Sequence, residues 1–147
     1  MPTNTSSSNV HFHFLKGGNS LNERTRLKPF IASVFKKEKK KLGNIQYIFC
    51  SDDYLLEMNR EHLQHDYYTD IITFGLSGPG EPIEAEVYVS VDRVRDNAHQ
   101  FGTTVREELH RVIFHGALHL CGYKDKTQKD QGVMRKMEDK YLGLYFK

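Results

Sequence analysis

The stretch from His110 to Lys126, HRVIFHGALHLCGYKDK, holds the residues around which the rest of this 147-residue chain is organised. Apolar residues recur at helical spacing through it and predict a helix over Val105 to Leu120. His115 and His119 are then four positions apart on one face, where two imidazole rings can hold one metal ion. Apolar residues supply the other faces, so we expect this helix to be substantially buried.

A turn and a carboxylate follow this helix. Gly122 stands where the helix would end, because glycine enters the left-handed conformation of a helix C-terminus cheaply. Asp125 lies three residues later on the returning loop, which completes the spacing H-x3-H-x2-G-x2-D. Two histidines from a helix and a carboxylate from a loop match a site with three protein ligands and one open coordination position. We therefore predict that His115, His119 and Asp125 bind one metal ion.

Two other interpretations of this motif stay open. The histidines could be packed, hydrogen-bonded core residues, and Cys121 could replace Asp125 as a ligand if the helix stopped early. The zinc-protease motif H-E-x-x-H has a general base next to its first histidine, where this chain has Gly116. Ordinary metalloprotease chemistry is therefore disfavoured.

HGALHLCGY at 115–123 and TDIITF at 69–74 together resemble the YbeY family of single-strand-specific metallo-endoribonucleases. The resemblance extends from about Val10 to the C-terminal helix, and the histidine motif is its most specific part. It implies a zinc-dependent enzyme that cleaves single-stranded RNA in ribosomal RNA maturation, at the 3′ end of 16S ribosomal RNA, and in ribosome quality control. It also implies ribosomal RNA or the ribosome as partners.

The chain departs from the family pattern at two places. The family usually has Asp-His after the tyrosine, where this chain has Lys124 and Asp125, so by position Asp125 inherits the role of third ligand. Two histidines and a carboxylate also describe many iron(II) sites, which leaves other divalent transition metals open. In the family an arginine thought to contact RNA commonly stands four residues after the position of Asn59; this chain has Leu63 there. The nearby Arg60 is expected to point to a different face.

Arg111 and Asp70 are the candidate catalytic residues, although the sequence identifies no general base. Arg111 lies one turn before His115, where it could hold a phosphate or pair with Glu108. Asp70 belongs to a strand that, by the resemblance, borders the cleft. It could hydrogen-bond the site or merely fix the preceding loop.

Length and composition predict a flexible N-terminus over residues 1–9 and a single metallo-hydrolase domain over residues 10–147. The chain has no run of about 18 apolar residues and no signal-peptide pattern, so we expect a cytoplasmic protein that does not associate with membranes. Two cysteines fit a reducing compartment. A net charge of +2 permits RNA binding without demonstrating it.

The predicted order of elements indicates an α+β fold, in which a small mixed sheet of about four strands packs against helices. The order is strand, helix, strand, helix, strand, strand, helix, helix, helix. The predicted strands are 10–15, 45–50, 69–74 and 83–91, and the predicted helices are 22–41, 53–62, 93–101, 105–120 and 126–141. Gly43 and Asn44 are expected to end the first helix, whose lysine-rich end at 36–41 is either solvated or a phosphate contact. In the last helix Val133, Met134 and Met137 are expected to face inward.

The function we predict is metal-dependent hydrolysis of single-stranded RNA, with bases splayed onto aromatic rings such as Tyr67 and Tyr68. Two other classes remain as alternatives. One is a metallopeptidase, suggested by the ligand spacing. The other is a non-catalytic, ribosome-associated module in which the metal is structural.

Overall fold

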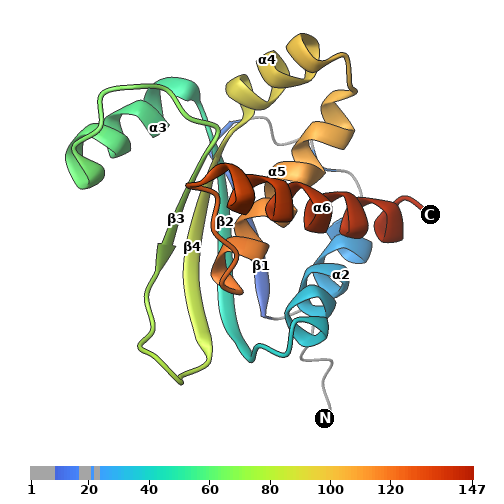
Figure 1. Cartoon of the computed structure of the whole chain (residues 1–147). Coiled ribbons are helices and arrows are strands. Elements are labelled where there is room, and N and C mark those ends of the chain that lie inside the picture. The colour runs from blue at the N-terminus through green and yellow to red at the C-terminus, as the bar shows by residue number, and fades with distance from the viewer. Residues whose placement is uncertain (1–8, 17–20, 22–23) are drawn as a thin grey trace.

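The computed structural model describes residues 9–16, 21 and 24–147, which form a four-stranded sheet with helices packed against it (Figure 1). The strands are β1 (Val10–Phe14), β2 (Leu42–Cys50), β3 (Ile71–Gly75) and β4 (Ile83–Ser90). The helices are α2 (Arg24–Lys37), α3 (Asp52–Met58), α4 (Val91–Phe101), α5 (Val105–Leu120) and α6 (Gln128–Tyr145), and a π-helical turn, η1 (Asn59–Leu63), follows α3 directly. The predicted order of strands and helices is confirmed, and so is the α+β class.

The sheet has the strand order β1-β2-β4-β3 and is mixed, as predicted. β1, β2 and β4 run parallel, whereas β3 is antiparallel to β4 and forms one edge. Helix α2 makes the crossover between the parallel strands β1 and β2, which a hairpin cannot join. The edge strand β3 lies beside the histidine helix, so the sheet contributes one wall of the predicted site.

Helix α5 has the predicted bounds because its ends carry local signals. Thr104 is the N-cap, and its hydroxyl accepts a hydrogen bond from the backbone N–H of Glu107. At the other end Gly122 adopts a φ of +112°, in the left-handed region that glycine tolerates. The helix packs between the sheet and α6 and is largely buried, as expected (Figure 1).

Two hydrophobic clusters hold the molecule together, one on each face of the sheet. The larger one joins α2, α5 and α6 to the face formed by residues such as Tyr47, Phe49, Val87 and Val89. Alternate strand residues point to the other face, where a smaller cluster around Leu55 joins α3 to the sheet. Helices α3 and α6 lie on opposite faces of the sheet, and the start of β3 lies between them.

Several predicted boundaries around the sheet are wrong by a few residues. Helix α2 ends at Lys37, and Lys39 adopts a positive φ of 61°, so the lysine run is not a continuous helix end. Gly43 and Asn44 do not end a helix; they lie inside a longer β2, where Leu42 and Asn44 pair with β4 and Gly43 lies at a β-bulge between them. The reason is tertiary, because pairing with β4 recruits residues that resemble a turn in isolation. The predicted start of α2 at Asn22 lies outside the described residues.

Two helices differ from expectation in shape and length. The predicted helix 53–62 is a short α-helix that widens into the π-helical turn η1 before Gln64 closes it at a φ of 57°. Helix α6 extends past Tyr141 to Tyr145, which is buried against α2 and α5. Val133 was expected to face inward but is 43% exposed, whereas the neighbouring Met134 is buried as predicted. The buried face of α6 is therefore formed by Met134, Glu138, Tyr141, Leu142 and Tyr145, and Val133 lies outside it.

Candidate metal centre

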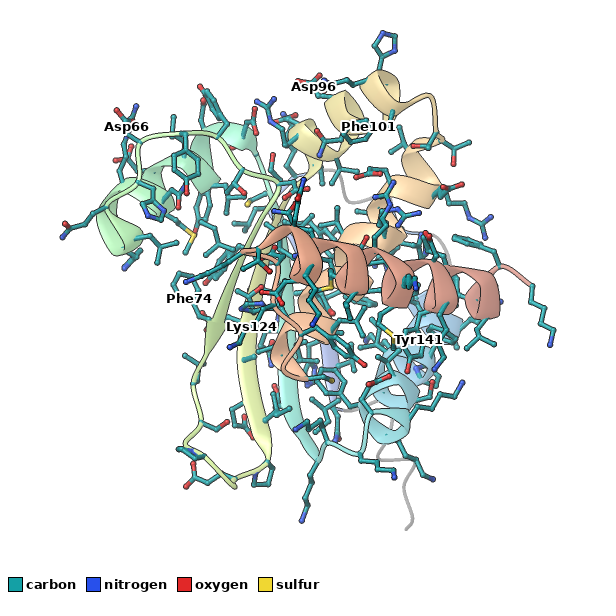
Figure 2. All side chains as sticks on the ribbon, viewed as in Figure 1. Asp66, Phe74, Asp96, Phe101, Lys124 and Tyr141 are labelled. Atoms are coloured by element: carbon teal, nitrogen blue, oxygen red, sulfur yellow. The ribbon has the colours of Figure 1, made fainter. Side chains whose placement is uncertain are left out.

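The three predicted ligands lie around one cleft, which we call the histidine cleft. His115 and His119 come from the C-terminal half of α5, and Asp125 comes from the loop between α5 and α6, just after Lys124 (Figure 2). The cleft has a volume of about 230 Å³. Its other walls come from η1, the following loop and β3: Asn59, Leu63, His65, Tyr67, Thr69, Ile71, Ile72 and Thr73.

His115 is fixed between two carboxylates. Its Nδ1 lies 2.7 Å from Oε2 of Glu138 on α6, and its Nε2 lies 3.2 Å from Oδ2 of Asp125. Burial alone would lower the pKa of His115, but the hydrogen bond and charge of Glu138, with the charges of Asp125 and Asp70, outweigh burial and raise this pKa. Oε2 of Glu138 accepts the Nδ1 proton, which leaves Nε2 directed at the cleft and at Asp125.

The distance between Nε2 of His115 and Oδ2 of Asp125 would allow both atoms to bind one ion. Donor atoms about 2.0 to 2.2 Å from a tetrahedral zinc lie roughly 3.3 Å apart, close to the observed 3.2 Å. His119 lines the same cleft and would supply the third donor. In the part of the chain that the structure describes, however, no group of three or more His, Cys, Asp or Glu side chains is ready to hold a metal ion. Chemically, two imidazoles and a carboxylate suit zinc.

Arg111 is not placed to bind substrate phosphate. Its guanidinium donates to Oε1 of Glu138 at 3.0 Å and to Oδ1 of Asp139 at 2.8 Å, and its side chain is only 12% exposed. The predicted pairing with Glu108 is not among its ion pairs. Arg111 instead neutralises Glu138, so it acts on His115 through that carboxylate.

Asp70 lies on the far side of His115, in a second cavity. Its Oδ2 accepts a hydrogen bond from Nδ2 of Asn97 at 3.2 Å, and burial raises the pKa of this carboxyl group. Glu108 lines the same cavity, and burial followed by the charge of Asp70 raises its pKa too. Two acids with raised pKa values beside His115 were not an expectation from the sequence.

The structure also bears on the rival ligand Cys121 and on Gly116, the position of the general base in zinc proteases. Cys121 is buried in the large core cluster, and burial raises the pKa of its thiol to about 12, which is unfavourable for a thiolate ligand. A Cβ atom on Gly116 would lie 3.0 Å from the side chains of Ile71 and Val87. Helix α5 thus approaches the sheet too closely to carry a glutamate at Gly116.

The loop before β3 forms the rim of the histidine cleft. Leu63 lines the cleft where the family commonly has arginine, and it is 40% exposed. Arg60 points to a different place, as expected, and pairs with Asp66 at 2.6 Å. Tyr67 lines the cleft and is exposed. Its ring stacks on His65 with centroids 5.1 Å apart.

Glu138 is the site residue that the sequence prediction missed. It is 6% exposed and belongs to a face of α6 that also carries Met134, Tyr141 and Leu142. A single acid at an inward position of an amphipathic helix was the available signal, because a buried charge needs a partner. Its partner could not be read from the sequence, since His115 lies 23 residues earlier on another helix.

No helix in the described ranges combines the length and apolar character needed to cross a membrane.

Comparisons with known proteins identify relatives of this chain. A family model described as Endoribonuclease YbeY matches residues 18–145. The Endoribonuclease YbeY of Cytophaga hutchinsonii is 52% identical over 124 residues, which cover 84% of this chain and 87% of the relative. The Endoribonuclease YbeY of Bacteroides thetaiotaomicron is 49% identical over 115 residues, which cover 78% of this chain and 83% of the relative.

A solved structure supports the same relationship. The solution structure of TM1509 from Thermotoga maritima has a TM-score of 0.66 and 29% sequence identity to this chain. The match covers 93% of this chain and 89% of that one. Because the family model spans most of the sequence and relatives about half identical cover most of it, this chain belongs to the YbeY endoribonuclease family.

Proposed function

We propose that this protein is a zinc-dependent endoribonuclease that cleaves single-stranded RNA, with ribosomal RNA as its substrate during ribosome maturation and quality control in the cytoplasm. The observation that carries this proposal is the histidine cleft, where His115 and Asp125 face each other at 3.2 Å and His119 lines the same walls. The endoribonuclease name of the relatives supports RNA as the substrate and favours it over the peptidase and binding-module alternatives.

The donor set supports zinc chemistry at this place. Bound zinc supplies Lewis acidity, which polarises a phosphate and makes water a better nucleophile. His115 and His119 would bind zinc as neutral imidazoles, and the carboxylate of Asp125 would offset one of the two positive charges of the ion. Glu138 orients the ring of His115, as carboxylates commonly do for metal-binding histidines.

The cleft also supports single-stranded RNA over a duplex. Its rim carries the stacked pair His65 and Tyr67, onto which an unpaired base can lie. A base within a duplex is already stacked and does not offer its face to a side chain. Leu63 contributes an apolar contact rather than a charge, so phosphate binding depends more on the metal in this chain than in relatives with arginine there.

The test combines metal content with cleavage. Wild type, H115A, H119A and D125A are loaded with zinc, analysed for metal and assayed on a single-stranded ribosomal RNA fragment. We expect one zinc per chain in the wild type, with loss of zinc and a drop in cleavage of at least about two orders of magnitude in each variant. H99A is the matched control, because His99 is exposed on α4.

Three outcomes would overturn the proposal. Unchanged cleavage in H115A and H119A would remove the histidine cleft as the active site. Zinc binding without cleavage of any RNA would favour the non-catalytic module. Zinc-dependent cleavage of an unfolded protein, but not of RNA, would favour the peptidase.

A further inference from the structure

A second cavity adjoins the histidine cleft on the other side of His115. It has a volume of about 370 Å³ and lies between the start of β3, the C-terminal end of α4 and the helices α5 and α6. His115 and Asp125 line both spaces, so a nucleotide bound at the metal centre would have its neighbour within reach of this cavity. A volume of this size falls within the usual range for small-ligand pockets, about 300 to 1,000 Å³. We call it the Glu108 cavity.

Glu108 is the unexplained group in this cavity. It is 5% exposed, and within residues 9–16, 21 and 24–147 no side chain pairs with its carboxylate. Its oxygen atoms do not belong to the fully enclosed polar atoms that lack a partner, so they open into the cavity. The other polar groups around it are engaged: Arg111 pairs with Glu138 and Asp139, and Asp70 accepts from Asn97. A carboxylate that has no protein partner and opens into a cavity accepts hydrogen bonds from whatever fills that cavity, either water or a ligand with N–H donors.

The charges of the cavity decide which part of an RNA can enter. Four acids line it, Asp70, Glu108, Asp125 and Glu138, beside two arginines, Arg111 and Arg135. The acids outnumber the arginines, and Arg111 is already paired with carboxylates, so the cavity disfavours a phosphate. A nucleobase amino group has the opposite preference, because Glu and Asp accept hydrogen bonds from it. Cytosine, adenine and guanine carry such an amino group, whereas uracil presents carbonyl oxygens and a single N–H.

The rim of the cavity suits a flat apolar ring. Phe101 lines it at the end of α4 and is 59% exposed, an unusual position for a phenylalanine (Figure 2). A base stacked on an exposed aromatic ring gains affinity whatever its identity. Phe101 can therefore hold the base while Glu108, deeper in the cavity, reads its edge.

Accepting the proposed nuclease function, we propose that the Glu108 cavity is a base-binding subsite, in which Glu108 accepts a hydrogen bond from the exocyclic amino group of a nucleobase next to the cleaved phosphate. The enzyme then prefers to cleave beside cytosine, adenine or guanine over uracil.

The first test measures cleavage preference. Oligouridine substrates that carry one internal cytidine, adenosine or guanosine are compared with oligouridine alone. We expect kcat/KM to be about tenfold higher for a substrate with an amino-bearing base. In E108Q the amide can donate to a uracil carbonyl, so the preference should shrink or invert toward uridine. E107Q is the matched control: it makes the same chemical change one residue earlier and keeps the N-cap hydrogen bond, which Thr104 accepts from the backbone N–H of residue 107.

The second test does not depend on cleavage. Metal-free protein is titrated with cytidine or uridine, and the backbone NMR signals of Asn97, Phe101 and Glu108 are followed. Cytidine should shift them in the wild type and in E107Q, but much less in E108Q, and uridine should shift them weakly. This pattern would support the subsite even if the protein cleaved no RNA, so failure of the nuclease proposal is distinguishable.

The proposal is overturned by any of three results. One is equal kcat/KM on all substrates together with equal responses to both nucleosides. Another is an unchanged preference in an E108Q variant whose thermal unfolding matches the wild type. The third is a response to magnesium chloride alone and not to cytidine, which would make the cavity a cation site.

Discussion

At the scale of single residues, the orientation of His115 depends on one carboxylate. Glu138 is buried, lies 2.7 Å from Nδ1 of His115, and is itself neutralised by Arg111. This arrangement fixes which ring nitrogen faces the cleft before any metal arrives. Metal-binding histidines commonly rely on such a carboxylate, and its loss typically lowers metal affinity 10- to 100-fold.

We therefore expect E138A to raise the zinc dissociation constant by about 10- to 100-fold, measured by competition with a chromogenic chelator. E138Q should have a smaller effect, because the amide oxygen can still accept the Nδ1 proton. D139N is the control: Asp139 also pairs with Arg111, whereas the carboxylates that contact His115 are those of Glu138 and Asp125. Equal zinc affinity in E138A and D139N would contradict the role of Glu138.

At the scale of secondary-structure elements, the spacing between α5 and the sheet explains why the histidine motif contains glycine. A Cβ atom at Gly116 would meet Val87 and Ile71 at 3.0 Å. Val87 is fully buried and branched at Cβ, so it has little freedom to move aside. Close contact with β3 is what brings His115 and His119 to the cleft formed with that strand.

G116A should therefore lower the free energy of unfolding by about 1 to 2 kcal/mol, because overpacking outweighs the better helix propensity of alanine. G132A offers the matched comparison within α6, where a Cβ atom would meet nothing within 4 Å. This second variant should raise stability by about 0.5 to 1 kcal/mol. Urea unfolding of both variants measures the difference, and stabilisation by G116A would refute the packing argument.

At the scale of the whole molecule, a polar network joins segments that the hydrophobic clusters leave separate. Asp92, in the first turn of α4, accepts a hydrogen bond from Lys16 after β1 at 2.7 Å and from the backbone N–H of Asp52 in α3 at 2.9 Å. Arg93 donates to the carboxylate of Asp52 at 2.6 Å. The network holds α3, and with it the rim of the histidine cleft, against α4.

The network makes stability depend on pH in a defined direction. The hydrogen bond from Lys16, then that from Asp52, lowers the pKa of Asp92. A carboxyl group with a lowered pKa binds fewer protons in the folded state than in the unfolded state. Asp92 therefore stabilises the fold fully above its unfolded pKa of about 3.9. This stabilisation is lost as the pH falls through its folded pKa. D92N should cost about 0.5 to 1 kcal/mol near pH 7, a small value because Asp92 is partly exposed.

Thermal unfolding of D92N and wild type from pH 7 to pH 2 tests this expectation. The two curves should converge at the acid end, where wild-type Asp92 is also protonated. D96N is the control, because Asp96 is 69% exposed and its contact with Arg93 is longer, at 3.4 Å. A constant difference between wild type and D92N at every pH would rule out the charge of Asp92 as the cause.

The sequence by itself determined the features that act over a few residues. Helix α5 was predicted with its correct bounds, because its cap at Thr104 and the turn at Gly122 lie at its ends. The same local geometry put His115 and His119 one turn apart. The element order, the α+β class and the family followed from patterns of this kind, and the structure and the comparisons confirm them.

Tertiary structure decided whatever depends on which element packs against which. Pairing with β4 extended β2 through Gly43, and the packing of α6 on α5 gave His115 its partner Glu138 and took Arg111 away from the cleft. The Glu108 cavity exists because α4, α5, α6 and β3 meet around one carboxylate. The contacts of Glu138 with His115 and Arg111 join residues 23 or more positions apart. No periodicity or cap within one segment encodes them, because packing between segments sets side-chain partners.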